Sequence, residues 1–343
     1  MKYFFYTLSI FLVTFIAFGF LYYNGILAKA SDNFSARMAG DLQLASVASI
    51  KLPVPPEERV STLLFVGDMM LSRGVGNKMA KYNDYVYPFR QTADFLRSAD
   101  LTIGNLEGPI SDRGEDTKKL YSFRDDPRAM EGLKLAGFDI LDVNNNHIMD
   151  WGEEALKDTL TRITDNGINY VGAGFNYDEA NAPVIKNING TKIAFLAFND
   201  LSLEYSQSIG SRPGLSDFDL SKITDHIKNI KETKQADIVV VMLHWGQEYQ
   251  TESNRRQKDI AHRLVDSGAD LVIGHHPHVV QETEQYGGGQ IVYSLGNFVF
   301  DQHDASTTEG LVVRVTIKDG KIRPIEPIAI KISPDFQPFI PSL

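Results

Sequence analysis

The sequence predicts an α/β fold built on a largely parallel sheet, or on two sheets. Short apolar runs alternate with longer amphipathic stretches, and strands separated by helical patterns of about 10–15 residues are typical of βαβ units. A polar cluster directly follows five of these apolar runs. Open α/β sheets bind ligands beyond the carboxyl ends of their strands. The later runs resemble hairpins, so we expect a mixed sheet or a second sheet.

The individual elements follow from the period of the apolar residues. Strands are predicted at residues 62–66, 101–103, 139–143, 192–198, 238–243, 271–273, 291–293 and 311–317. Helices are predicted at residues 89–99, 128–136, 152–166, 220–234 and 255–267. Asp319 and Gly320 interrupt the last apolar segment, and an Asp-Gly pair between such runs indicates a β-hairpin.

Composition excludes several classes of protein and site. The chain has 343 residues, 43% hydrophobic and 23% charged, which is ordinary for a globular protein. The net charge of −10 argues against a nucleic-acid partner or a basic grip on anionic lipid. Cysteine is absent, so the chain has no disulfide framework. Any metal must be held by nitrogen and oxygen ligands.

The N-terminus carries a membrane signal. After Lys2, the run 3–23 has no charged residue, and about 20 apolar residues match the hydrocarbon thickness of a bilayer. The favoured interpretation is a single-pass anchor at residues 4–23, with a cytoplasmic tip at 1–3 and the rest of the chain outside the cell membrane. Ala28-Lys29-Ala30 resembles a cleavage site, so a cleaved signal and a secreted protein is the alternative.

Proline-rich segments delimit the globular domain. Residues 24–60 are predicted to be a linker. They include Pro-Val-Pro-Pro-Glu-Glu at 53–58, which continues neither a helix nor a central strand. The domain itself is expected at 61–333. Residues 334–343 form a second proline-spaced segment, expected to be extended.

The five polar clusters converge in space if their strands are parallel and neighbouring. They are Gly67-Asp68, Gly104-Asn105-Leu106-Glu107, Asn144-Asn145-Asn146-His147, His244-Trp245-Gly246-Gln247-Glu248 and Gly274-His275-His276-Pro277-His278. Each cluster also has a simpler interpretation. Asp68 suits a turn or a helix N-cap, the asparagines suit a loop, Glu107 suits a solvated position and His244 suits a satisfied core histidine.

Together, the clusters predict a site for one or two divalent ions, because imidazole suits Zn, Mn or Fe. Two such ions clamp a phosphoryl group and generate hydroxide, while a histidine next to a ligand asparagine can protonate a leaving oxygen. Arg73 and Arg124 are candidates for binding an anion, or form ordinary surface salt bridges. The remaining histidines and the tryptophans are left out of the predicted site: His226, His262, His303, Trp151 and Trp245.

The order of motifs resembles the CapA family of poly-gamma-glutamate capsule synthesis proteins, a branch of the calcineurin-like metallophosphoesterase superfamily. The similarity spans residues 62–316. The six blocks that carry it are Val66-Gly-Asp-Met-Met-Leu-Ser-Arg, Gly104-Asn-Leu-Glu-Gly-Pro, Asn144-Asn-Asn-His-Ile-Met-Asp-Trp-Gly, His244-Trp-Gly-Gln-Glu-Tyr, Gly274-His-His-Pro-His-Val-Val-Gln and Tyr293-Ser-Leu-Gly-Asn-Phe. The resemblance implies a four-layer α/β/β/α sandwich, metallophosphoesterase-like, with metal ligands on its central loops.

The resemblance also implies roles for individual residues. His147 is expected to act on the substrate as an acid. The implied metal ligands are Asp68, Glu107, Asn146, His244, His276 and His278, which leaves His275 as a neighbour outside the ligand set. Asn105 and Asn297 join Arg73 and Arg124 as expected substrate contacts.

Two positions depart from the pattern of the superfamily. The histidine usually found two residues after the first aspartate is Met70 here, and the usual bridging aspartate is Asn105. Both replacements are shared with the CapA branch. Each removes a donor, which lowers affinity for at least one ion.

Three functions remain open at this point. The first is a membrane-anchored protein that takes part in synthesis, transport or anchoring of an anionic polymer such as poly-gamma-glutamate, with capsule-synthesis membrane subunits as partners. The second is a metal-dependent phosphoesterase with an envelope substrate. The third is a non-catalytic scaffold that binds polymer, which Met70 favours.

Overall fold

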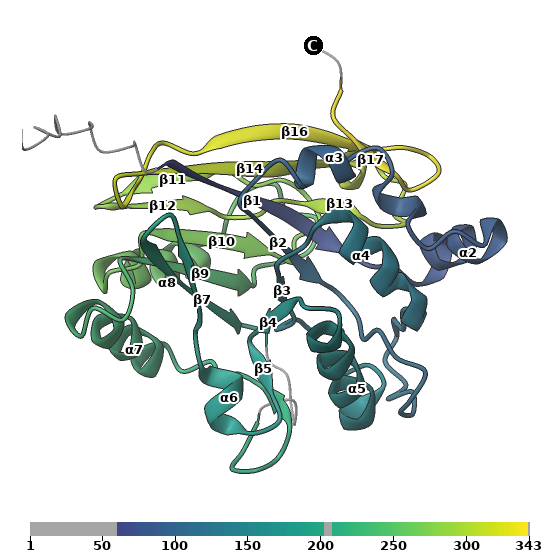
Figure 1. Cartoon of the computed structure of the whole chain (residues 1–343), viewed down its shortest axis with the longest axis horizontal. Helices are drawn as coiled ribbons and strands as arrows, with labels where there is room; N and C mark the ends of the chain where they lie inside the picture. The colour runs from purple at the N-terminus through teal and green to yellow at the C-terminus, as the bar shows by residue number, and fades with distance from the viewer. Residues whose placement is uncertain (1–59, 202–207, 342–343) are drawn as a thin grey trace, which may run out of the picture. The chain divides into compact units, whose positions relative to one another are not determined.

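The computed structural model describes residues 60–201 and 208–341 of the chain. These residues form a mixed α/β fold with two large sheets (Figure 1). The prediction of strands alternating with helices is confirmed. The predicted anchor at 4–23, the tip before it and most of the predicted linker lie outside the described residues.

The first sheet has the strand order β17-β16-β14-β1-β2-β3-β4, with β13 paired to β1 and β15 paired to β14. Strands β1 to β4 are parallel, whereas β14 to β17 run antiparallel beside β1. Its strands are β1 (Val60–Met69), β2 (Leu101–Leu106), β3 (Ile140–Asp142), β4 (Asn169–Val171), β13 (Asn297–Val299), β14 (Glu309–Lys318), β15 (Lys321–Ile322), β16 (Glu326–Ile332) and β17 (Pro338–Phe339).

The second sheet has the order β11-β12-β10-β9-β7-β6, and its four central strands are parallel. Its strands are β6 (Val184–Ile188), β7 (Thr191–Asn199), β9 (Ile238–His244), β10 (Leu271–His275), β11 (Thr283–Tyr286) and β12 (Gly289–Val292). A separate pair joins β5 (Ala173–Gly174) to β8 (Gly214–Leu215).

Helices cover the outer face of each sheet. Those packed on the first sheet include α2 (Arg73–Tyr82), α3 (Ala93–Leu96), α4 (Met130–Ala136) and α5 (Gly152–Asp165), and those on the second are α7 (Leu220–Glu232) and α8 (Arg255–Asp266). The remaining helical segments are α6 (Tyr177–Asn181), η1 (Tyr87–Phe89), η2 (Pro127–Ala129) and η3 (Ala305–Thr308). Figure 1 shows α7 and α8 on one side of the sheets and α4 and α5 on the other.

The two sheets pack face to face through a shared apolar core. Phe65 of β1 and Phe195 of β7 belong to one buried cluster, with ring centroids 6.5 Å apart. Separate clusters join the first sheet to α4 and α5 and the second sheet to α7 and α8. Because each sheet buries both faces, its central strands are almost continuously apolar rather than alternating. The layers follow the order helix, sheet, sheet, helix.

Strand register aligns the polar clusters. Asp68 lies opposite Asn105 in β2 and opposite Asn297 in β13. In the second sheet His244 lies opposite His275. The side chains that follow the carboxyl ends of both sheets therefore meet at one edge of the sandwich, as the sequence predicts.

Helices α2 and α3 differ from the prediction. Only Ala93–Leu96 of the predicted helix 89–99 is α-helical, since the chain must turn before β2 begins at Leu101. Helix α2 was not predicted, because two glycines in its first turn weaken the helical signal. It forms because Val75 and Met79 are buried and the amide of Gly74 donates to Asp301 Oδ2 at 2.9 Å. The hairpin at Asp319 and Gly320 is confirmed, with both residues at positive φ.

Within residues 60–201 and 208–341, none of the helices has the length and apolar character required to cross a bilayer.

In the C-terminal segment, β17 adds to the edge of the first sheet by pairing with β16.

Gly274, in β10, tests how closely the backbone that follows the neighbouring strand β12 must approach it. A Cβ at this position would lie 1.9 Å from the backbone oxygen of Tyr293. We expect Gly274→Ala to lower the free energy of unfolding by about 1–3 kcal/mol, because backbone must move to accept it. Gly288→Ala is the matched control, since no atom beyond its chain neighbours lies within 4 Å of the added methyl, and its effect should stay within about 0.5 kcal/mol. Urea unfolding measures both; equal effects would contradict this account.

Candidate metal centre

Asp68, at the end of β1, lies at the middle of the site and is fully buried. Its Oδ1 accepts a hydrogen bond from Asn105 Nδ2 at 2.8 Å and its Oδ2 accepts from the amide of His276 at 3.1 Å. The Nδ1 atoms of His275 and His278 lie 3.1 Å and 3.4 Å from its oxygens. Burial alone would raise the pKa of Asp68, but the two histidines hold that pKa well below its usual value.

Asn105 and Glu107 continue the site along β2. Asn105 Nδ2 also lies 3.3 Å from Glu107 Oε2, and Asn105 Oδ1 accepts from Asn145 Nδ2 at 2.9 Å. Both side chains are fully buried. Burial raises the pKa of Glu107 well above its usual value, and Glu107 Oε1 has no hydrogen-bond partner. Asn105 therefore lies between the carboxylates of Asp68 and Glu107. The Oε1 atom of Glu107 remains available as a ligand.

The orientation of His278 follows from a chain of hydrogen bonds behind it. Asn297 Nδ2 donates to the backbone oxygen of Thr307 at 3.0 Å and to Gln302 Oε1 at 2.8 Å. Its Oδ1 therefore faces His278 Nδ1, 3.0 Å away, and that nitrogen must carry a proton. The remaining nitrogen, Nε2, lies 3.5 Å from Glu107 Oε1. Asn297 thus lies behind a metal-ligand candidate and directs its Nε2 into the site.

Protonation differs between the neighbouring histidines. Burial lowers the pKa of His278, but the charge of Glu107 and the contact with Asp68 outweigh it and raise the pKa to about 9. Burial, reinforced by His278, lowers the pKa of His276 to about 4. Burial also holds the pKa of His244 well below its usual value. His244 and His276 are therefore neutral at pH 7 and keep a lone pair, as metal ligands must.

His244 contacts both Asn146 and His276. Its Nε2 lies 2.9 Å from Asn146 Oδ1, and its ring centroid lies 4.8 Å from that of His276. The Nδ1 atoms of His244 and His276 have no hydrogen-bond partner. Two sequence clusters that are about a hundred residues apart thus meet here.

Backbone strain accompanies this arrangement. His276 and His278 have φ angles of 97° and 57°, which non-glycine residues rarely adopt and which cost about 1–3 kcal/mol each. The tight bend at Pro277 brings the amide of His276 and the ring of His278 to Asp68. Strain of this kind persists only where the surrounding structure enforces it.

His147 lies beside the ligand candidates and is held by Asp150. Its Nδ1 lies 2.7 Å from Asp150 Oδ2, and its ring stacks on Phe123 at 3.9 Å. Asp150 is fully buried and also receives Lys119 Nζ at 2.8 Å and the amide of Phe123 at 2.8 Å. Because Nδ1 is engaged, Nε2 is the nitrogen of His147 that can exchange a proton with a bound molecule.

A pocket of about 160 Å³ opens onto these histidines. Arg73 lines it and is held by Asp301 at 3.1 Å. The other predicted anion contact, Arg124, lies 3.7 Å above the ring of Trp151 and does not line this pocket. The lining residues are Arg73, Tyr121, Phe123, His147, Glu248, Tyr249, His278, Phe300 and Gln302.

The donor set fits divalent cations. Two groups of side chains place one ligand atom each within 4.8 Å of one another: Asp68, Glu107 and His244 in one, and Glu248, His276 and His278 in the other. Buried acceptor atoms without partners are rare in proteins, yet this cluster contains Glu107 Oε1 and the Nδ1 atoms of His244 and His276. All are nitrogen or oxygen donors, which suit Mn, Zn or Fe.

The structure brings together most of the predicted site and adds to it. The predicted ligands converge, and Met70 is fully buried in the apolar core, where it supplies no nitrogen or oxygen donor. The Nδ1 atom of His275, expected to stand outside the ligand set, lies 3.1 Å from Asp68 Oδ1. Sequence reasoning missed Asp150 and Glu248, although each lies in a quoted block, three residues after His147 and four after His244.

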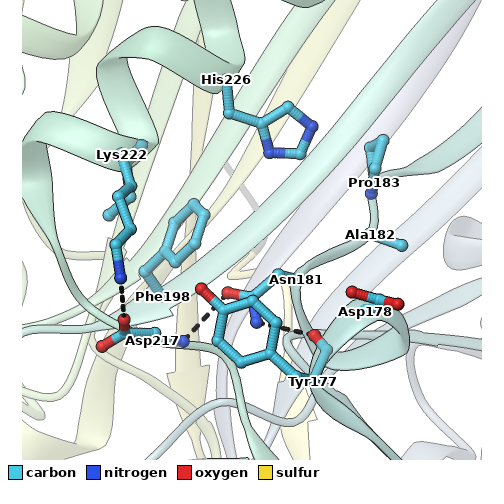
Figure 2. A pocket seen from close by; sticks show the side chains of 10 residues that line it. Tyr177, Asp178, Asn181, Ala182, Pro183, Phe198, Asp217, Lys222 and His226 are labelled. Atoms are coloured by element: carbon cyan, nitrogen blue, oxygen red, sulfur yellow. Dashed lines mark hydrogen bonds and ion pairs between the residues drawn. The ribbon is translucent and has the colours of Figure 1, made fainter. Parts of the chain in front are cut away.

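A larger pocket, of about 380 Å³, lies elsewhere and shares no lining residue with the site. Figure 2 shows Tyr177, His226 and Phe198 around it, beside the ion pair of Lys222 with Asp217 at 3.0 Å. His226 lines this pocket, and His262 stacks on Tyr286, so both are away from the metal-ligand candidates.

Solved structures share this fold at low sequence identity. A hypothetical protein from Thermus thermophilus matches with a TM-score of 0.51 and 17% identity, over 79% of this chain and 99% of that one. The NAD nucleotidase NadN of Haemophilus influenzae matches with a TM-score of 0.51 and 11% identity, over 83% of this chain and 54% of that one. These similarities concern the fold alone.

Sequence relatives are closer. The capsule biosynthesis protein CapA of Bacillus anthracis is 34% identical over 286 residues, which cover 80% of this chain and 68% of that protein. The PGA biosynthesis protein CapA of Bacillus subtilis is 36% identical over 257 residues, covering 74% of this chain and 67% of that protein. The model of the bacterial capsule synthesis protein family, PGA_cap, matches residues 62–302. The chain therefore belongs to the bacterial capsule synthesis protein family.

Proposed function

We propose that this protein takes part in the synthesis, transport or anchoring of an anionic capsule polymer of the poly-gamma-glutamate type, using a divalent-metal-dependent, hydrolase-like site. The observation that carries the proposal is the convergence of buried carboxylates and neutral histidines, with unpartnered donor atoms, beside a pocket that His278 lines. Membership of the capsule synthesis family supports the choice of polymer.

Asp68, Glu107, Asn146, His244, His276 and His278 would hold one or two ions. When bound, a divalent ion neutralises negative charge and lowers the pKa of water, which favours hydrolysis or transfer at a carbonyl or phosphoryl group. The nitrogen and oxygen donors suit Mn, Zn or Fe.

The rest of the pocket suits an anionic chain and proton transfer. Arg73 lines the pocket, and its guanidinium matches carboxylate or phosphate geometry. His147, oriented by Asp150, would donate a proton to the leaving group from Nε2. Asp150 keeps the ring in place.

A second candidate is a non-catalytic scaffold that binds polymer in the same pocket. Met70 favours it, because a core thioether stands at a position where the resemblance implies a metal-binding histidine. Turnover that depends on added metal would exclude the scaffold, and turnover of a phosphoester in preference to the polymer would favour an envelope phosphoesterase instead.

For location we propose a single-pass anchor at residues 4–23, with the domain outside the cell membrane and capsule-synthesis membrane subunits as partners. The uncharged run 3–23 and the proline-rich end of the linker support it. Protease accessibility in intact spheroplasts, with a C-terminal tag, tests the orientation. Protection of the tag from external protease would contradict it.

Metal content tests the centre directly. We expect the full chain, purified in detergent and dialysed against Mn²⁺, to retain at least one ion per chain by elemental analysis. We expect this binding because buried donor atoms of Glu107, His244 and His276 have no hydrogen-bond partner. Less than about a tenth of an ion per chain would contradict a metal site of the kind described.

Metal affinity should rise with pH. In the metal-free protein the pKa of His278 is about 9, so below that pH an ion must displace at least one proton. We expect the apparent Kd for Mn²⁺ to fall about tenfold per unit from about pH 6 to pH 8. Isothermal titration calorimetry in buffers of different ionisation enthalpy measures both the Kd and the released proton; a Kd independent of pH would contradict the assignment of His278.

The role of His147 is tested by substitution. We expect His147→Ala to lower metal-dependent hydrolysis of poly-gamma-glutamate or of a generic phosphoester by about 10²–10⁴-fold in kcat, the usual contribution of an acid–base group. His303→Ala is the matched control, because His303 is exposed and lies outside the lining of the pocket. Equal rates for the two variants would rule out the proton-transfer role.

A further inference from the structure

Glu248 lies on a loop that is hydrogen-bonded to the segment carrying His275, His276 and His278. The amide of Trp245 donates to the backbone oxygen of His275 at 3.2 Å, and the amide of Tyr249 donates to that of Pro277 at 2.8 Å. The indole of Trp245 is fully buried and donates to the oxygen of Tyr293 at 2.9 Å. The loop is thus anchored on both sides of Glu248, and its carboxylate lines the pocket together with His278.

The turn that presents Glu248 is strained, as the histidine loop is. Tyr249, next to Glu248, has a φ of 64°, which non-glycine residues rarely adopt. Tyr249 accepts a hydrogen bond at its hydroxyl from Gln302 Nε2 at 3.1 Å. Gln302 in turn belongs to the chain that orients His278 through Asn297. One hydrogen-bonded network therefore holds both the turn that presents Glu248 and the ring of His278.

Glu248, His276 and His278 form a second group of candidate ligands beside the group of Asp68, Glu107 and His244. One ligand atom each of Glu248, His276 and His278 lies within 4.8 Å of the others, as do those of Asp68, Glu107 and His244. The groups adjoin where His278 Nε2 lies 3.5 Å from Glu107 Oε1, and again where the rings of His276 and His244 lie 4.8 Å apart. Two adjoining groups of donors are the arrangement that two-metal sites require.

Charge supports the same interpretation. The two adjoining ligand groups contain the carboxylates of Asp68, Glu107 and Glu248. Carboxylates that converge without a cation repel one another. His276, in contrast, is buried with an Nδ1 that has no partner. A cation between these groups would satisfy that nitrogen and relieve the repulsion.

We propose that Glu248 is a ligand of a second divalent ion, held with His276 and His278, next to an ion held by Asp68, Glu107 and His244. This inference rests on the proposed metal centre and deepens it. Glu248 would make the centre dinuclear by adding a carboxylate from outside the residues implied by family resemblance. The second ion would be the one nearer the pocket mouth, because Glu248 is more exposed than the residues of the first group.

The experiment compares Mn²⁺ binding by the full chain in detergent, the Glu248→Gln variant and the Glu248→Asp variant. Equilibrium dialysis gives stoichiometry and each Kd, and electron paramagnetic resonance distinguishes a coupled pair of Mn²⁺ ions from an isolated one. We expect two ions and a coupled spectrum for the wild type. Glu248→Gln should keep the tighter ion, weaken the second by at least about 10–100-fold and show the sextet of an isolated ion. Glu248→Asp, which keeps the charge, should fall between them.

Glu252→Gln is the matched control, because Glu252 follows on the same loop and belongs to neither ligand group. It should bind as the wild type does. Circular dichroism and urea unfolding confirm that each variant folds. Two ions of unchanged affinity in Glu248→Gln, or a single ion in the wild type, would overturn the role of Glu248 and leave the first site standing. No ion in the wild type would overturn the proposed metal centre as well.

Discussion

The buried carboxylate of Asp68 is the interaction on which the arrangement of the site depends. It sits at the end of β1 in the first sheet and accepts the amide of His276, which follows β10 in the second sheet. A charge removed from water destabilises the fold unless it is paired and hydrogen-bonded. Asn105 and the neighbouring histidines supply that pairing. The same contacts therefore join the two sheets at this edge and assemble the ligands.

Around this carboxylate, the supporting residues matter as much as the ligand candidates. Asn297 defines which nitrogen of His278 faces the site, and Asp150 does the same for His147. Both are themselves held by several hydrogen bonds. Side chains held this way need little reorganisation when an ion or substrate arrives. The strain at His276 and His278 is tolerated because this surrounding network enforces it.

Much of the fold was predictable because both sheets are buried on two faces. Apolar runs such as 238–243 and 271–273 mark such strands clearly, and helices with one apolar face, such as α7 and α8, are equally clear. Elements stabilised by tertiary contacts were not predictable. Helix α2, with two glycines, forms only because its apolar side chains reach the core and Asp301 binds its first turn.

By itself, the sequence determined which residues follow the carboxyl ends of the strands, and so which donors are available: Asp68, Glu107, His244 and the histidines after β10. Those positions follow from local pattern alone. Only the tertiary structure decided how they combine, because side-chain direction and protonation depend on partners distant in the chain. Thus Asn297 came to lie behind His278, Arg124 came to stack on Trp151 away from the pocket, and Glu248 came to face His276 across a loop anchored by Pro277.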